Sequence, residues 1–401
     1  MLDKTIKKLN LRPYLSGLLP LFLLAHFGHH VFPSILRPLM PMIRTDLGLS
    51  YTQSGFTMSA FSVTAGISHL LSGWLADRFG SRLMVLLSIT GVAIAGLLIG
   101  LSHSYMALII FLVVAAIMAG GYHPAASATV SMLAPPEYRG RTLAIHEICG
   151  SSAFWMIPLL VAPIATAWGW RGSYITLTIP TIMLGILLYI LLGRQRQSHV
   201  GEFLKPDNEV PTESAGVPWR KIGPFIIISI TTTIAIRSVS AFLSLYAVDS
   251  LGLSEATAAM LMAVSPAVTL FAAPLGGYLS DRFGSMPMLL IISFLAIPFI
   301  YLLGIASSAQ ALAALMVALG IASGSRMPAS ESYIASNTPN RCRATVLGLY
   351  FFGITEGSGL LTPVMGTLID QFGFYFCFTI TSAATTAVLT VCSLFLWRNR
   401  K

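Results

Sequence analysis

Long apolar segments with almost no charge constrain the fold of this chain more than any other feature. They recur along all 401 residues, and each is about 20 residues or longer, the length a helix needs to cross the hydrocarbon core of a bilayer. Only helices and closed barrels can span a bilayer, because every backbone polar group must be paired within the protein. The alternating strands of a barrel do not occur in this sequence. It therefore predicts an all-α membrane protein.

Twelve such segments can be placed along the chain. Hydrophobic residues make up 55% of the sequence and charged residues 10%, against about 25% charged residues in an ordinary soluble domain, so a soluble fold is excluded. The twelve expected transmembrane helices lie approximately at residues 15–42, 52–74, 82–102, 105–133, 141–167, 172–193, 222–248, 255–279, 286–306, 309–337, 343–369 and 374–397.

The formal net charge of +9 is explained by membrane topology. If the N-terminus is cytoplasmic, almost all loop lysines and arginines fall on the inner side, and the outer side keeps only Arg44 and Arg171. This bias predicts a multi-pass protein of the cytoplasmic (inner) membrane with both termini in the cytoplasm. It argues against a nucleic-acid partner. The expected partners are the lipid bilayer, protons and a small-molecule substrate, and the chain is expected to be a monomer.

The sequence has no pattern typical of a cofactor, a resident metal or an enzyme. A phosphate-binding loop is missing, and no nucleophile–base constellation is apparent. The four cysteines are far apart and are interpreted as packing residues: Cys149, Cys342, Cys377 and Cys392.

The two halves of the chain repeat one another. The segment "GWLADRFGS" at residues 73–81 returns as "GYLSDRFGS" at residues 277–285, an offset of 204. The same offset relates Pro124 to Pro328 and "WGW" to "FGF". We therefore expect an N-terminal six-helix bundle at 1–194, a cytoplasmic linker at 195–220 and a C-terminal six-helix bundle at 221–401, a pseudo-symmetric arrangement.

These features resemble the major facilitator superfamily (MFS) of secondary transporters, whose signature between the second and third spans is similar to "GWLADRFGSR". The resemblance implies an MFS fold and transport by alternating access. It also implies that the acid of the motif pairs with a base near the start of the fifth span. The candidate gating residues are Gly73, Asp77, Arg78, Gly80, Arg82, Arg139, Arg141, Asp281 and Arg282.

Ionisable residues occur in the spans that this resemblance places around a central cavity, the first, fourth, seventh and tenth. The third, sixth, ninth and twelfth spans, which it places outside, carry no Asp, Glu, Lys or Arg away from their ends. Charges within a bilayer are expected to face the interior of the bundle. The candidate substrate-binding residues are His26, His29, His30, Arg37, His123, Arg237 and Arg326.

The stretch "HFGHHVFPSILRP" in the first span contains four of these residues. At about 100° per residue, His26, His30, Pro33 and Arg37 share one helical stripe with His29 at its margin. Pro33 is expected to kink the helix. Similar stripes on the seventh and tenth spans are expected to converge with it on one pocket near the midplane. Because planar guanidinium forks bind anions, the predicted substrate is anionic or carries an anionic group.

Buried acids and histidines are candidates for coupling transport to protons, because burial can bring their protonation into the physiological range. The hypothesis is that Glu147 or Glu356 exchanges the proton and that His146 or the first-span histidines relay it. A static ion pair is the alternative for each acid, and Arg326 could pair with Glu331 or Glu356. The candidate coupling residues are His146, Glu147, Glu331 and Glu356.

Three functions remain open on the sequence. Proton-coupled efflux of an anionic or amphiphilic compound is favoured slightly by a resemblance to fosmidomycin-resistance-type exporters, carried by the histidine-containing first span, "GGYHPAASA" and "GSSAF". An arginine common in the fourth span of drug/proton antiporters is missing. Proton-coupled import of an organic anion is the second possibility. Transport of a transition metal by His26 and His30 is the third, and it requires further ligands.

The motif between the second and third spans generates a first prediction. Asp77→Asn is expected to slow transport turnover while leaving substrate affinity nearly unchanged, because the acid is assigned to the gate and not to the pocket. Turnover in proteoliposomes and equilibrium binding are the two measurements. Normal turnover would contradict the gating assignment.

Overall fold

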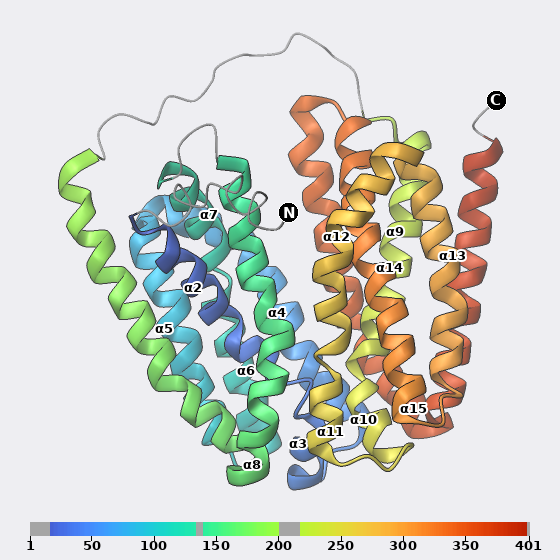
Figure 1. Ribbon diagram of the computed structural model, residues 1–401, viewed down its shortest axis with the longest axis horizontal. Helices are drawn as coiled ribbons and strands as arrows, with labels where there is room; N and C mark the ends of the chain where they lie inside the picture. The colour runs from blue at the N-terminus through green and yellow to red at the C-terminus, as the bar shows by residue number, and fades with distance from the viewer. Residues whose placement is uncertain (1–16, 134–138, 200–216, 399–401) are drawn as a thin grey trace, which may run out of the picture. The chain divides into compact units, whose positions relative to one another are not determined.

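The computed structural model describes residues 17–133, 139–199 and 217–398, apart from some side chains within the helices. Every regular element in this part of the chain is a helix (Figure 1), as predicted. Most of the expected linker lies outside the described residues. The helices are α2 (Leu19–Val31), η1 (Phe32–Ser34), α3 (Met40–Leu47), α4 (Tyr51–Phe79), α5 (Ser81–Gly100), α6 (Tyr105–Ala119), α7 (Tyr122–Leu133), α8 (Arg139–His199), α9 (Trp219–Ala241), α10 (Leu243–Asp249), α11 (Glu255–Leu261), α12 (Val264–Phe283), α13 (Ser285–Leu303), α14 (Ala309–Ser336) and α15 (Asn340–Arg398).

Seven helical stretches in the described residues are long and apolar enough to cross a membrane. Two of them, within α8 and α15, are 52 residues long, far more than the roughly 20 residues that one crossing needs. Each of these helices contains one glycine with non-helical backbone angles, Gly169 and Gly373, where two helices meet. The structure thus supports a polytopic helical membrane protein, and the count of twelve spans remains a prediction.

The sequence repeat reappears in the backbone conformation. Three pairs of glycines with positive φ are each separated by 204 positions: Gly48 and Gly252, Gly80 and Gly284, and Gly169 and Gly373. The serines that cap α6 and α14, Ser104 and Ser308, have the same separation, and each accepts a hydrogen bond from the backbone three residues on. The two copies of the repeat therefore turn and restart their helices at equivalent positions.

The first predicted span is interrupted. Helix α2 ends at Val31, and a short 3₁₀ turn containing Pro33 follows before α3 begins at Met40. Proline has no backbone N–H and clashes with the preceding turn, so a regular helix cannot continue. Ser34 donates a hydrogen bond of 2.7 Å to the carbonyl of His30 near this break. The single helical stripe expected from His26 to Arg37 was therefore wrong beyond α2.

Contacts divide the chain into two compact units. Unit 1 comprises Met1–Ile35, Thr64–Ile157 and Trp168–Lys205, and its core includes Phe22, Tyr122 and Leu188. Unit 2 comprises Leu36–Val63, Pro158–Ala167 and Pro206–Lys401, and its core includes Phe225, Tyr350 and Leu389. The expected division into bundles 1–194 and 221–401 follows the sequence repeat, and it remains a prediction.

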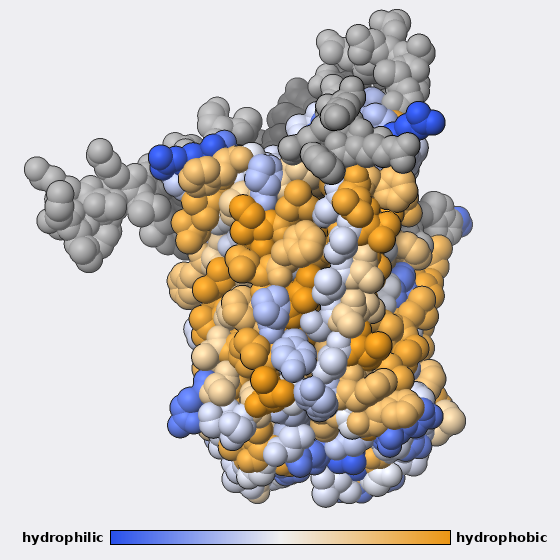
Figure 2. Space-filling model, turned by 90° about the vertical axis from the view of Figure 1, so that its right-hand side faces the viewer, coloured by the Kyte–Doolittle hydropathy of each residue, from blue (hydrophilic) through white to orange (hydrophobic). Residues whose placement is uncertain are grey.

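Large hydrophobic side chains cover the outer face of several helices. On the side of the molecule in Figure 2 they dominate the middle, and hydrophilic residues gather toward the ends. Helix α13 exposes Ile291, Phe294 and Leu295, and the end of α15 exposes Leu394 and Phe395. Such surfaces are typical of helices in contact with lipid. The expectation that the ninth and twelfth spans lie outside remains a prediction.

Gly373 offers a test of the turn within α15. Its φ of 78° and ψ of 174° lie in a region that is essentially restricted to glycine, so Gly373→Ala is expected to lower the free energy of unfolding by about 1–3 kcal/mol. Gly348 is a matched control in the same helix, because its φ is not positive and nothing lies near an added methyl group. The midpoint of thermal unfolding should fall for Gly373→Ala and not for Gly348→Ala. Equal midpoints would contradict the strained turn.

Candidate functional site

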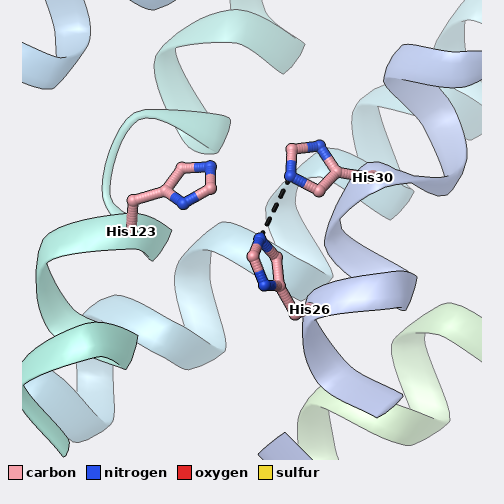
Figure 3. Close-up of side chains that lie close together, drawn as sticks. All are labelled: His26, His30 and His123. Atoms are coloured by element: carbon pink, nitrogen blue, oxygen red, sulfur yellow. Dashed lines mark hydrogen bonds between the residues drawn. The ribbon is translucent and has the colours of Figure 1, made fainter. Parts of the chain in front are cut away.

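Histidines from three helices meet inside unit 1. His26 and His29 of α2 are buried, His146 of α8 is buried, and His30 and His123 are half-buried. The ring of His26 lies 4.1 Å from that of His146 and 5.1 Å from that of His123, centroid to centroid. Figure 3 shows His26, His30 and His123 turned toward one another from α2 and α7. The sequence predicted the residues of this cluster but not their convergence.

The hydrogen bonds of His26 define its tautomer. Its Nδ1 lies 2.8 Å from the backbone carbonyl of His146, and a carbonyl only accepts, so Nδ1 carries the hydrogen. In the neutral ring Nε2 is then an acceptor. This atom lies 3.2 Å from Nε2 of His30, which must be the donor. His26 therefore presents a lone pair toward the centre of the cluster.

The surroundings of the cluster hold these rings in place. Tyr122 stacks on His29 with ring centroids 4.4 Å apart, and its hydroxyl lies 3.3 Å from Nε2 of His146. Glycine is needed at position 150, because a methyl group there would lie 2.4 Å from Nε2 of His26. Nδ1 of His146 lies 3.9 Å from the carboxylate of Glu147, which is largely exposed. The cluster can bind a proton or another cation through neutral imidazoles.

Three arginines form a second group, inside unit 2. Arg326 of α14 is 3% exposed, and it donates hydrogen bonds to the carbonyl and hydroxyl of Ser229 and to the hydroxyl of Tyr350. Ser229 in turn bonds to Ser330 and Tyr350 at 2.8 Å. All partners of the Arg326 guanidinium are uncharged. Helices α9, α14 and α15 thus fix its position through hydrogen bonds to uncharged groups.

Arg37 and Arg237 complete this group. The charges of Arg37 and Arg326 both act on Arg237, which lies within the candidate span Ile222–Asp249 and yet retains solvent-accessible surface. The backbone carbonyl of Arg37 accepts a hydrogen bond of 2.7 Å from Ser244. Within the described residues, neither the Arg37 nor the Arg237 guanidinium has a hydrogen bond or an ion pair. An anion is the ligand that this arrangement favours.

The predicted coupling acids of unit 2, Glu331 and Glu356, form no ion pair with a side chain that the structure describes. No ion pair within the described part of the chain joins Arg326 to Glu331 or Glu356, although Glu331 lies within electrostatic range of Arg326. One carboxylate oxygen of each acid is buried without a hydrogen-bond partner. The pairing of Arg326 with either acid, left open by the sequence, is not formed here.

The predicted gating residues are described in part. Arg82 donates a hydrogen bond of 2.9 Å to the carbonyl of Tyr189 and stacks over its ring, so it joins α5 to α8 within unit 1. Gly80 has the positive φ expected of the turn. Arg78, Asp281 and Arg282 are exposed. The remaining predicted gating side chains, Gly73, Asp77, Arg139 and Arg141, lie outside the described part.

A capping contact at the start of α4 was missed by the sequence analysis. Asp370 of α15 accepts hydrogen bonds from the backbone N–H groups of Tyr51 and Thr52, at 2.9 and 2.8 Å, and from the Thr52 hydroxyl at 2.6 Å. These N–H groups have no partner within the helix, and the helix dipole favours a negative charge there. Gly366 permits the approach, because a methyl group on it would lie 2.4 Å from the Tyr51 carbonyl.

Asp249 of α10 makes the neighbouring contact. Its carboxylate accepts hydrogen bonds from Arg44 at 3.1 Å and from the Tyr51 hydroxyl at 2.7 Å. Arg44 also lies over the Tyr51 ring at 4.2 Å. The signal in the sequence was a pair of acids, Asp249 and Asp370, at the outer ends of predicted spans, but their partners are about 200 to 320 residues away. Only the fold brings them together.

Apolar helices around two groups of ionisable residues define the class of protein, a helical membrane transporter. The sequence model of the Major Facilitator Superfamily matches residues 22–297 and 225–401. The chain belongs to this superfamily, as the motif predicted, and the family consists of transporters and not of enzymes.

Individual proteins are similar to this chain in sequence or in fold. The multidrug resistance protein MdtG of Enterobacter lignolyticus (strain SCF1) is 25% identical over 372 residues, covering 90% of this chain and 88% of that protein. A peptide transporter POT solved in complex with sulfate aligns with a TM-score of 0.78 at 15% identity, covering 95% of this chain and 94% of that one. A D-xylose–proton symporter aligns with a TM-score of 0.70 at 18% identity over 94% of this chain and 96% of that one.

The cap on α4 gives a prediction. Asp370→Ala removes three hydrogen bonds to Tyr51 and Thr52, and amide hydrogen exchange at the start of α4 is expected to speed up about tenfold or more, for a loss of about 1–3 kcal/mol. Mass spectrometry of exchanged peptides covering residues 50–56 measures this. Asp46→Ala, which changes an exposed acid on α3, serves as the control. Unchanged exchange in Asp370→Ala would show that the cap does not stabilise α4.

Proposed function

We propose that this protein is a proton-coupled exporter that moves small anionic or amphiphilic solutes across the cytoplasmic membrane by alternating access, with both termini in the cytoplasm. The observation that carries the proposal is the group of arginines Arg37, Arg237 and Arg326, which form no ion pair in the described residues.

The charge of these three arginines indicates a functional role. Removing a charged side chain from water costs several kcal/mol, and charged residues within spans are typically functional for that reason. Arg326 is held by hydroxyl and carbonyl oxygens alone, while the guanidinium forks of Arg37 and Arg237 are available. A phosphonate, a carboxylate or a similar anion would supply the missing charge and accept paired hydrogen bonds from the planar guanidinium groups.

Proton coupling is assigned to the unpaired acids of unit 2. Glu356 is 9% exposed, and one of its carboxylate oxygens has no hydrogen-bond partner in the described residues. A carboxyl group can take up and release a proton, so these acids are the proposed carriers of the coupled proton. Glu331 lies within electrostatic range of Arg326. A carboxylate left there after release of the proton would compete with the substrate anion for positive charge, which is the exchange that an antiporter needs. The hypothesis that His146 and Glu147 carry the proton remains a prediction.

Efflux is preferred to uptake because curated relatives with nearly full coverage are named multidrug resistance proteins. Import of an organic anion is the alternative, since the arginine group would bind an anion in either direction. The resemblance to fosmidomycin-resistance-type exporters makes phosphonates the first compounds to test.

Antibiotic susceptibility of an efflux-deficient bacterial host tests this function. Expression of the protein is expected to raise the tolerated concentration of fosmidomycin, another phosphonate or an amphiphilic toxicant at least about fourfold, and Arg237→Ala should abolish the protection because it removes one fork of the anion site. The Arg237→Lys variant should protect the host weakly. Arg220 is an exposed arginine at the start of α9, and the Arg220→Ala variant should protect the host as well as the wild type does.

Membrane levels of each variant have to be matched. Protection that survives Arg237→Ala would contradict the anion site. No protection by the wild-type protein against any of these compounds would favour import, and uptake of radiolabelled organic anions under an imposed proton gradient would then be measured.

A further inference from the structure

We propose that His26, His30 and His123 form a site in unit 1 for one divalent transition-metal ion of the Zn²⁺ class, held through three neutral imidazoles. This inference goes beyond the proposed function, because it assigns a second ligand to a different part of the chain. The sequence offered only His26 and His30 for such an ion, and the structure adds His123.

The spacing of the nitrogen atoms fits a shared ion. Nε2 of His26 and Nε2 of His30 are 3.2 Å apart, and two nitrogen ligands at 2.0–2.1 Å from a tetrahedral zinc ion are separated by about 3.3 Å. One ligand atom from each of the three histidines lies within 4.8 Å of the other two. His123 comes from α7 and faces the other two rings (Figure 3), so an approach of about 1–2 Å completes tetrahedral spacing.

The orientation of His26 is the one that metal ligands adopt. A metal-bound histidine almost always donates its second ring N–H to a carbonyl or carboxylate, which fixes the tautomer and directs the lone pair at the metal. His26 already does this through Nδ1 and the His146 carbonyl at 2.8 Å. On binding, the hydrogen on Nε2 of His30 would be released and Nδ1 of the same ring would take up a proton, so the imidazole stays neutral. The metal ion would then lie between Nε2 of His26 and Nε2 of His30.

The donor set also selects the ion. Imidazole suits Zn²⁺, Co²⁺, Ni²⁺ and Cu²⁺, whereas Mg²⁺ and Ca²⁺ need oxygen ligands. Three protein ligands leave a fourth position open, as in exchangeable zinc sites and unlike closed structural ones.

Titration of the full-length protein with Co²⁺ tests the site. The protein is purified in detergent without a histidine tag, and chelator is removed before Co²⁺ is added. One equivalent of Co²⁺ is expected to bind, with the intense visible absorption of tetrahedral Co²⁺, and Zn²⁺ should displace it. His30→Gln and His123→Gln should each weaken binding at least about tenfold. His103→Gln, an exposed histidine outside the cluster, should bind as the wild type does.

Further measurements distinguish a loss of metal binding from misfolding and from failure of the anion site. Size-exclusion profiles must match the wild type for a variant to count, and Zn²⁺ should raise the thermal unfolding midpoint of the wild type but not of His30→Gln or His123→Gln. Arg237→Ala should bind Co²⁺ normally, so failure of the anion site leaves this result intact. The proposal is overturned if the wild type shows no tetrahedral spectrum, or if both folded cluster variants retain wild-type affinity.

Discussion

The proposed binding of an anion depends on the positive charge of Arg326. This side chain is buried and forms its hydrogen bonds with uncharged groups. Its guanidinium is bound by Ser229 and Tyr350, and its charge acts on Arg237 together with that of Arg37. A protein that needed only packing at these positions would gain stability from apolar residues, because buried charge is costly. The arrangement is understandable if an anion supplies the balancing charge during part of a transport cycle.

Along the chain, Pro33 lies between the histidines of α2 and Arg37. Because α2 ends at Val31 and α3 begins at Met40, the histidines of α2 pack in unit 1 while Arg37 belongs to unit 2. Arg37 is anchored there by the hydrogen bond from Ser244 to its carbonyl. The stretch "HFGHHVFPSILRP" at residues 26–38 therefore contributes to two chemical environments, one suited to cations and one to anions.

Local and periodic features were predictable from the sequence, and long-range contacts were not. Helical class, family and the kink at Pro33 followed from hydropathy, a repeated motif and proline chemistry, and the turns at Gly169 and Gly373 repeat with the sequence. The cap that Asp370 places on Tyr51 and Thr52 joins residues more than 300 positions apart, and no local pattern encodes it. Likewise, the tautomer of His26 depends on a backbone carbonyl 120 residues away.

The central claim is that the arginine group binds the negative charge of its substrate. Isothermal titration of the purified wild-type protein with fosmidomycin and with its uncharged phosphonate diester compares ligands that differ chiefly in charge. If the arginine group binds the anion, fosmidomycin should bind saturably and the diester should bind at least about tenfold more weakly, because guanidinium forks pair with anionic oxygens. Equal affinity for the two compounds would contradict it.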